Sequence, residues 1–113
     1  AVKHACHAVG CSAEVPPKML FCLAHWKLLP KPAQRIIWHY YVPGQETRKD
    51  PTLEYLMAQA CSCAIVAFKD KTWSSRQALN HVAVASKAAQ HAGLPLERCF
   101  EITRAMGCEI LVR

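Results

Sequence analysis

The chain has 113 residues, a formal net charge of +6 and an apolar content of 52%. This length suits one domain, or a small core with a short satellite, and excludes a conventional multi-domain enzyme. The apolar content excludes a disordered tail, and because no run of 18 apolar residues occurs, no transmembrane helix is expected.

The first thirty residues predict an irregular segment, since they contain closely spaced cysteines and histidines together with Gly10, Pro16 and Pro17. Four helices are predicted after this segment, because apolar residues recur there every three or four positions between proline and glycine boundaries. These helices are expected over residues 31–42, 51–69, 74–92 and 95–106.

Local signals support the predicted helix ends. Either Asp50 or Thr52 can cap the second helix, and Ser74 with Gln77 matches a capping box for the third. The polar segment 45–49 is expected to be a loop. The β-prone tail 108–113 is expected to form a lone strand, a sheet edge or an ordered tail.

The sequence therefore predicts a mainly α fold, in which a small zinc-stabilised N-terminal knob precedes about four helices. Residues 1–72 are expected to hold the knob with two helices, and residues 73–113 a helical hairpin extension. We expect the two parts to form one compact unit.

A metal-ligand pattern stands in the first part of the chain. Cys6, Cys11, Cys22 and His25 follow a C-x4-C-x10-C-x2-H spacing. Zinc is bound tetrahedrally by thiolate sulfur and imidazole nitrogen, and two closely spaced pairs can supply that geometry. Four protein ligands leave no position for a water molecule, so the predicted site is structural.

Alternatives to this ligand set remain open. Cys6 and Cys11 can instead be incidental thiols, and His7 or His4 can replace one cysteine as a ligand. Cys61 and Cys63 are two residues apart on a predicted helix, so they point to different sides and cannot chelate one ion together. A second site formed by His91, Cys99 and Cys108 is a further alternative.

Several short motifs in residues 4–66 resemble small zinc-finger-like proteins encoded in phage and prophage genomes. The matching motifs are Cys6-His7-x-x-Gly10-Cys11, Val15-Pro16-Pro17, Cys22-x-x-His25-Trp26, Leu29-Pro30-Lys31, Pro43-Gly44-Gln45-Glu46, and Tyr55 in the helix after Pro51. The resemblance implies a phage setting and matches the four zinc ligands above. Because most members have no assigned activity, it implies no mechanism, and residues 73–113 lie outside it.

The basic charge is concentrated in the same region, since residues 1–49 hold seven basic and two acidic side chains. The candidate basic contact residues are Lys18, Lys27, Lys31, Arg35, Arg48 and Lys49. Aromatic residues stand among them, and cations interleaved with aromatics suit single-stranded nucleic acid. However, the helical spacing of these aromatics favours a core position for most of them.

The segment Ala89–Leu94 offers a weak helix-turn-helix signal, but the apolar start of the next helix favours a plain helical hairpin. No phosphate-binding glycine loop and no nucleophile motif occurs, so we expect no enzyme. The odd number of seven cysteines and the lack of an evident signal peptide favour a reducing compartment, here the cytoplasm of a bacterial host.

The expected function is that of a non-enzymatic regulatory protein that binds nucleic acid or a nucleic-acid-associated protein, without a membrane. The alternative is an inhibitor of a host protein complex that acts by protein–protein contact alone. The oligomeric state and the identity of the partner are left open.

Overall fold

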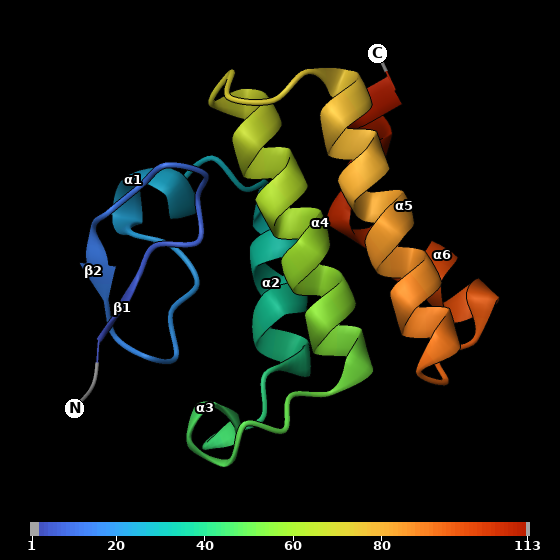
Figure 1. The fold of residues 1–113 in the computed structure, drawn as a ribbon, viewed down its shortest axis with the longest axis horizontal. Coiled ribbons are helices and arrows are strands. Elements are labelled where there is room, and N and C mark those ends of the chain that lie inside the picture. The colour runs from blue at the N-terminus through green and yellow to red at the C-terminus, as the bar shows by residue number, and fades with distance from the viewer. Residues whose placement is uncertain (1–2, 113) are drawn as a thin grey trace.

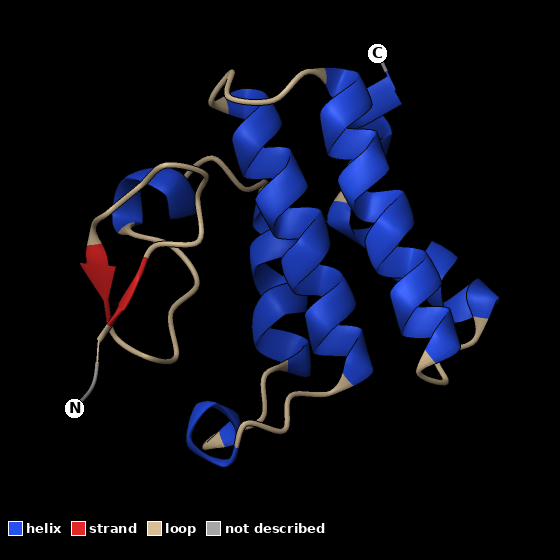
Figure 2. Cartoon of the chain, in the orientation of Figure 1, coloured by secondary structure: helices blue, strands red, loops and turns tan. Residues whose placement is uncertain are grey.

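The computed structural model describes residues 3–112 and shows a small N-terminal knob beside a group of helices (Figure 1). The elements follow one another as β1 (His4–Ala5), β2 (Glu14–Val15), α1 (Leu23–Trp26), α2 (Lys31–Tyr40), α3 (Gln45–Arg48), α4 (Leu53–Lys69), α5 (Ser75–His91), α6 (Leu96–Met106) and the 3-10 helix η1 (Cys108–Val112). Helices predominate (Figure 2), which confirms the mainly helical class. The four predicted helices agree with α2, α4, α5 and α6 to within two residues at each end.

The knob is built from short elements that pair early and late parts of its chain. Strand β1 lies antiparallel to β2, with His4 opposite Val15 and Ala5 opposite Glu14. The backbone N of His7 also donates to the carbonyl of Leu20 at 2.9 Å. These bonds bring the first cysteine loop beside the segment that enters α1.

Both long helices begin at the capping residues that the sequence offers. Thr52 caps α4, because its hydroxyl accepts a hydrogen bond from the backbone N of Tyr55 at 3.1 Å. Ser74 and Gln77 form the predicted capping box of α5. A capping residue satisfies backbone N–H groups that the first helical turn leaves free, so it fixes where the helix starts.

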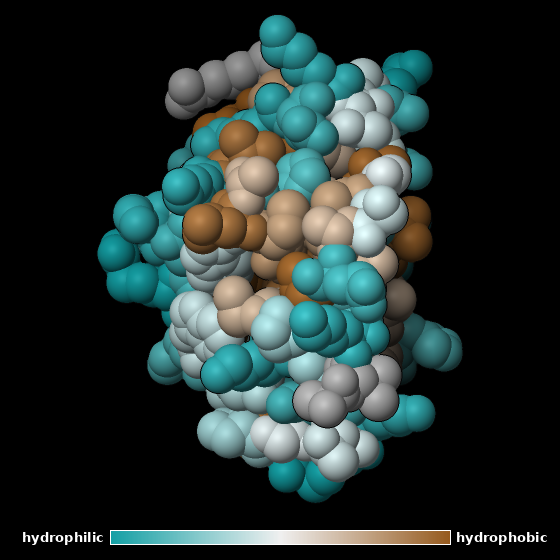
Figure 3. All heavy atoms as spheres, turned by 90° about the vertical axis from the view of Figure 1, so that its left-hand side faces the viewer, coloured by the Kyte–Doolittle hydropathy of each residue, from teal (hydrophilic) through white to brown (hydrophobic). Residues whose placement is uncertain are grey.

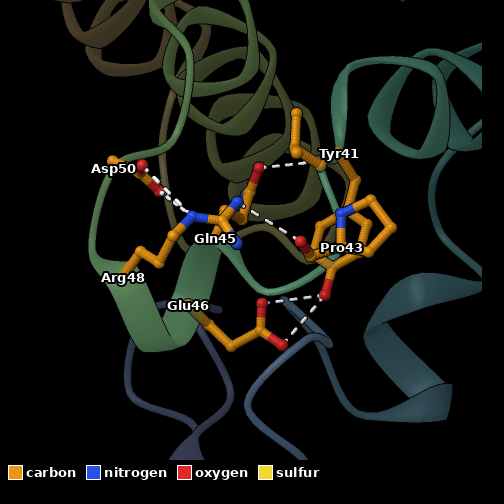
Figure 4. A network of polar contacts seen from close by, with 7 residues as sticks. Tyr41, Pro43, Gln45, Glu46, Arg48 and Asp50 are labelled. Carbon is orange, nitrogen blue, oxygen red and sulfur yellow. Dashed lines mark hydrogen bonds and ion pairs between the residues drawn. The ribbon is translucent and has the colours of Figure 1, made fainter.

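Segment 45–49 is not the predicted loop, since most of it forms the single turn α3. Gly44 precedes this turn with φ +86°, and a Cβ atom there would lie 2.7 Å from Nη1 of Arg48. The side-chain Oε1 of Gln45 accepts a hydrogen bond from the backbone N of Val42 at 2.8 Å (Figure 4). The turn therefore depends on bonds specific to this segment, which its polar composition does not reveal.

The predicted strand in the tail is wrong, because Cys108–Val112 is a 3-10 helix. Gly107 ends α6 in the left-handed conformation and turns the chain back onto the other helices. Cys108 and Leu111 are thereby buried, and the carbonyl of Leu111 accepts a hydrogen bond from the hydroxyl of Ser75. Burial against α4, α5 and α6 outweighs the local β-propensity of the tail.

Helix α4 lies at the centre of the core and contacts α2, α5, α6 and η1. It carries two fully buried large side chains, Met57 and Ile65. The same buried cluster includes Phe21 from the knob and Met106 from α6. Side chains from both predicted parts, 1–72 and 73–113, thus share one core.

None of the helices in residues 3–112 has both the length and the apolar character that crossing a membrane requires.

Candidate metal centre

The knob places each of the four predicted ligands at the end of a short element. Cys6 directly follows β1, and Cys22 is the residue that begins α1, which also carries His25. Gly10 precedes Cys11 with φ +78°, a left-handed conformation that glycine adopts without strain. The sequence thus folds the two ligand pairs into two tight turns that face one another.

The four ligand atoms lie within 4.8 Å of one another, so one metal ion could contact all of them. The Nδ1 atom of His25 lies 3.2 Å from the sulfur of Cys22 and 3.6 Å from that of Cys6. Three cysteines and one histidine therefore form the group that the sequence predicts.

The protein environment shifts the thiol pKa values of two cysteines in this group in opposite directions. A backbone hydrogen bond from His25 lowers the pKa of Cys22 to about 7, so much of this thiol is ionised near neutral pH. Burial raises the pKa of Cys6, although the backbone N of Cys22 and the backbone N of Ala8 donate to its sulfur at 3.3 and 3.5 Å. Metal binding requires thiolates, so a bound ion would offset the cost of ionising the buried Cys6.

Asp70, at the end of α4, completes the surroundings of His25. Its Oδ2 atom lies 3.4 Å from Nε2 of His25, the ring nitrogen that does not face the cysteines. Histidine ligands commonly donate their second N–H to a carboxylate, which fixes the tautomer and orientation of the ring. Asp70 is not predictable from the sequence, because its distance along the chain from the cysteine motif leaves no local signal.

We expect Asp70→Asn to lower metal affinity by about tenfold, at the lower end of the range for such supporting residues because the pair is partly exposed. The amide keeps the shape of the side chain but no longer stabilises the imidazole through a negative charge. A competition titration against a chromophoric chelator measures the change. Asp50→Asn is the matched control, since Asp50 is paired with Arg48 instead. Equal affinities for the two variants would contradict the role of Asp70.

The predicted substitute ligand His7 lies outside the group of four. Its Nδ1 atom accepts a hydrogen bond from Nε2 of Gln59 on α4 at 3.3 Å. Its ring also makes an edge-to-face contact with the ring of His4, at 5.1 Å between centroids. His7 thus connects the knob to α4 through this hydrogen bond.

The other four cysteines lie among the helices, where Cys61, Cys99 and Cys108 are buried and Cys63 is half-buried. Burial raises the pKa of Cys63 to about 12, and a hydrogen bond with Cys108, together with burial, raises that of Cys61. Within residues 3–112, the group around Cys6 is the only assembly of three or more potential metal ligands. The alternative site with His91 is therefore not assembled.

The six predicted basic residues are all exposed, but the structure places them in two separate regions. Lys31 and Arg35 lie one turn apart on α2, shortly after Lys27. Lys18 and Lys49 line a small cleft between the knob and α3.

Arg48 is the least available of the six. Its Nε atom donates to Asp50 at 3.2 Å, and its Nη2 atom donates to the carbonyl of Pro43 at 3.3 Å (Figure 4). These contacts indicate a local structural role in holding α3.

The aromatic residues at the end of α2 and directly after it do not all enter the core. Trp38 is 41% exposed, whereas Tyr40 and Tyr41 are half-buried. Trp38 makes edge-to-face contacts with Trp26, at 6.2 Å between ring centroids, and with Tyr41, at 5.4 Å. Its exposure escapes prediction because the residue falls between the core positions of the helix.

No protein-family model matches the chain, and neither the curated proteins nor the solved structures contain a significant match to it. The resemblance to phage-encoded proteins stays a prediction.

Proposed function

We propose that the four-ligand group binds one structural zinc ion. A tetrahedral site with zinc–sulfur bonds of about 2.3 Å and a zinc–nitrogen bond of about 2.0–2.1 Å separates a sulfur from the nitrogen by about 3.5 Å. The sulfur–nitrogen separations of 3.2 and 3.6 Å around His25 are close to that value. Three thiolates with one imidazole are also a ligand set characteristic of structural zinc.

The small size of the knob supports a structural role for the ion. Two-residue strands and a four-residue helix give the knob few hydrogen bonds of its own. In small metal-binding folds of this kind, much of the free energy of folding comes from metal binding. With all four positions taken by the protein, the ion holds the knob together.

We further propose that the protein acts by binding single-stranded nucleic acid, without chemistry of its own. The observation that carries this proposal is the exposed face of α2, where Lys31, Arg35 and Trp38 are spaced four and three residues apart. Residues at this spacing lie on one side of a helix. Cations that neutralise phosphates beside an exposed ring that can stack on a base are the elements of such a surface.

We expect Trp38→Ala to weaken binding of a labelled single-stranded oligonucleotide by about tenfold, since loss of one stacked base costs about 1–3 kcal/mol. Fluorescence anisotropy gives the affinity. Phe100→Ala is the control, because Phe100 is an aromatic residue of α6 that is 56% exposed and lines a groove with residues of α5. If the two variants bind equally well, stacking on Trp38 is not part of the interaction.

A second candidate is inhibition of a host protein complex, in the phage setting that the resemblance implies. A groove of about 560 Å³ favours it. Leu79 and Val82 of α5 and Phe100 of α6 line this groove, and Lys87 and Arg104 add positive charge. An apolar protein segment flanked by acidic side chains fits that lining. Capture of host proteins that survives nuclease treatment favours this candidate over nucleic acid.

A further inference from the structure

A second, polar cleft of about 160 Å³ lies where the knob meets the helices. Figure 3 shows the side of the molecule that carries the knob, where hydrophilic atoms surround a smaller apolar area. The lining of the cleft includes polar and charged side chains from the knob, from α3 and the residue after it, and from α4. Those relevant to ligand binding are Lys18, Gln45, Glu46, Lys49 and Tyr55.

Two buried polar side chains line the cleft with unused hydrogen-bond donors. Tyr55 is 5% exposed and Gln45 is 4% exposed. The Oε1 atom of Gln45 accepts from Val42. The Nε2 atom of Gln45 and the hydroxyl of Tyr55 make no hydrogen bond within residues 3–112, and neither atom is buried away from the cleft. Both atoms are therefore free to donate a hydrogen bond to an acceptor on a ligand in the cleft.

The charges at the cleft favour an anionic ligand. Lys18 and Lys49 contribute two cations, against the single carboxylate of Glu46. That carboxylate already accepts hydrogen bonds from the hydroxyl of Tyr41 at 2.8 and 2.9 Å (Figure 4). Its own backbone N–H, the Tyr41 hydroxyl, and the charges of Arg48 and Lys18 lower its pKa, so its negative charge is locally compensated.

We propose that this cleft binds one phosphate group of the nucleic-acid ligand. The two lysines supply charge, and the Tyr55 hydroxyl and the Gln45 amide supply neutral donors for the phosphate oxygens. The proposal rests on the proposed nucleic-acid function, and it adds a site that the exposed face of α2 does not contain.

Ring contacts connect the two regions. Trp38 contacts Tyr41, whose ring centroid lies 6.2 Å from that of Tyr55 at the cleft. A strand that stacks on Trp38 therefore has the proposed phosphate site close by, with only the Tyr41 ring between Trp38 and Tyr55. The volume of the cleft, about 160 Å³, accommodates a phosphate group.

Nuclear magnetic resonance on the isotope-labelled, metal-loaded full chain tests the proposal with inorganic phosphate as the probe. We expect the side-chain amide signals of Gln45 to shift with added phosphate. Lys18→Gln and Tyr55→Phe should each raise the phosphate Kd by about tenfold, the effect of losing one hydrogen bond to a charged group. Lys69→Gln is the matched control, because Lys69 is exposed at the opposite end of α4.

Phosphate that leaves the Gln45 amide unshifted overturns the proposal, as does an equal effect of Lys18→Gln and Lys69→Gln. Lys18 is exposed, so its variant tests the cleft even if Tyr55→Phe fails to fold.

Oligonucleotide binding separates this proposal from the broader function. If Tyr55→Phe and Trp38→Ala both weaken oligonucleotide binding, the cleft and the α2 face act together as proposed. If Trp38→Ala alone weakens it, the cleft proposal fails and the nucleic-acid function stands. If phosphate binds but no oligonucleotide does, the cleft takes free phosphate, and both proposals in their present form are wrong.

Discussion

Replacing Cys22 by alanine is expected to abolish stoichiometric zinc binding and to unfold the knob. The unaltered protein should hold about one equivalent of zinc, measured by elemental analysis. Cys22 is only half-buried, so the loss of its side chain leaves no core cavity, and the destabilisation reports the missing metal bond. Ligand bonds to a structural zinc contribute on the order of 10 kcal/mol in small zinc-dependent folds.

Hydrogen exchange shows where the variant loses structure. Amides of residues 4–29 should lose their protection, while those of α4 should keep most of it, because α4 is buried by α2, α5 and α6. Cys63→Ala is the control, since Cys63 is a half-buried cysteine of α4 that is not one of the four proposed ligands. A variant without metal that keeps full protection in the knob would show that zinc does not hold this part of the fold.

The second large effect is expected in the salt dependence of nucleic-acid binding. Each phosphate neutralised on a single strand contributes about 0.7 to the slope of log affinity against log salt concentration. Replacing Lys27, Lys31 and Arg35 together by glutamine should therefore reduce that slope by about 2 and weaken binding at low salt most strongly. Anisotropy titrations at several salt concentrations give both quantities.

A triple variant on the far helices controls for net charge. Arg76, Lys87 and Arg104 are exposed on α5 and α6, and replacing them by glutamine changes the total charge by the same amount. We expect this variant to keep the slope of the unaltered protein. If both triple variants lose the same slope, the attraction is a property of the whole surface and the α2 face has no special part in it.

The sequence predicts those parts of the fold that local chemistry determines. Pro32, the Ser74–Gln77 pair and Gly107 each mark a helix end by a steric or hydrogen-bonding rule that needs no distant partner. The tail escaped prediction because its β-prone side chains are buried by α4, α5 and α6. Those helices come together only in the complete fold.

The same distinction holds for the metal centre and its surroundings. The four ligands were predictable because the spacing within each pair already fits a metal site. Asp70 and the cleft around Tyr55 were not predictable, because each joins the knob to α4 across a long stretch of chain. The exposure of Trp38 depends on which face of α2 the core covers, and periodicity alone left that question open.

Among the described residues, two polar side-chain contacts connect the knob with α4: His7 with Gln59, and His25 with Asp70. These points lie about three helical turns, or ~16 Å, apart along the helix. His7 adjoins the proposed ligand Cys6 and His25 is itself a proposed ligand, so zinc binding would be thermodynamically linked to the position of the knob on α4. The knob also helps to form the cleft, so zinc binding and phosphate binding in the cleft would affect one another. Such linkage is reciprocal: if zinc raises the affinity of the cleft for phosphate by some factor, phosphate raises the affinity of the metal site for zinc by the same factor.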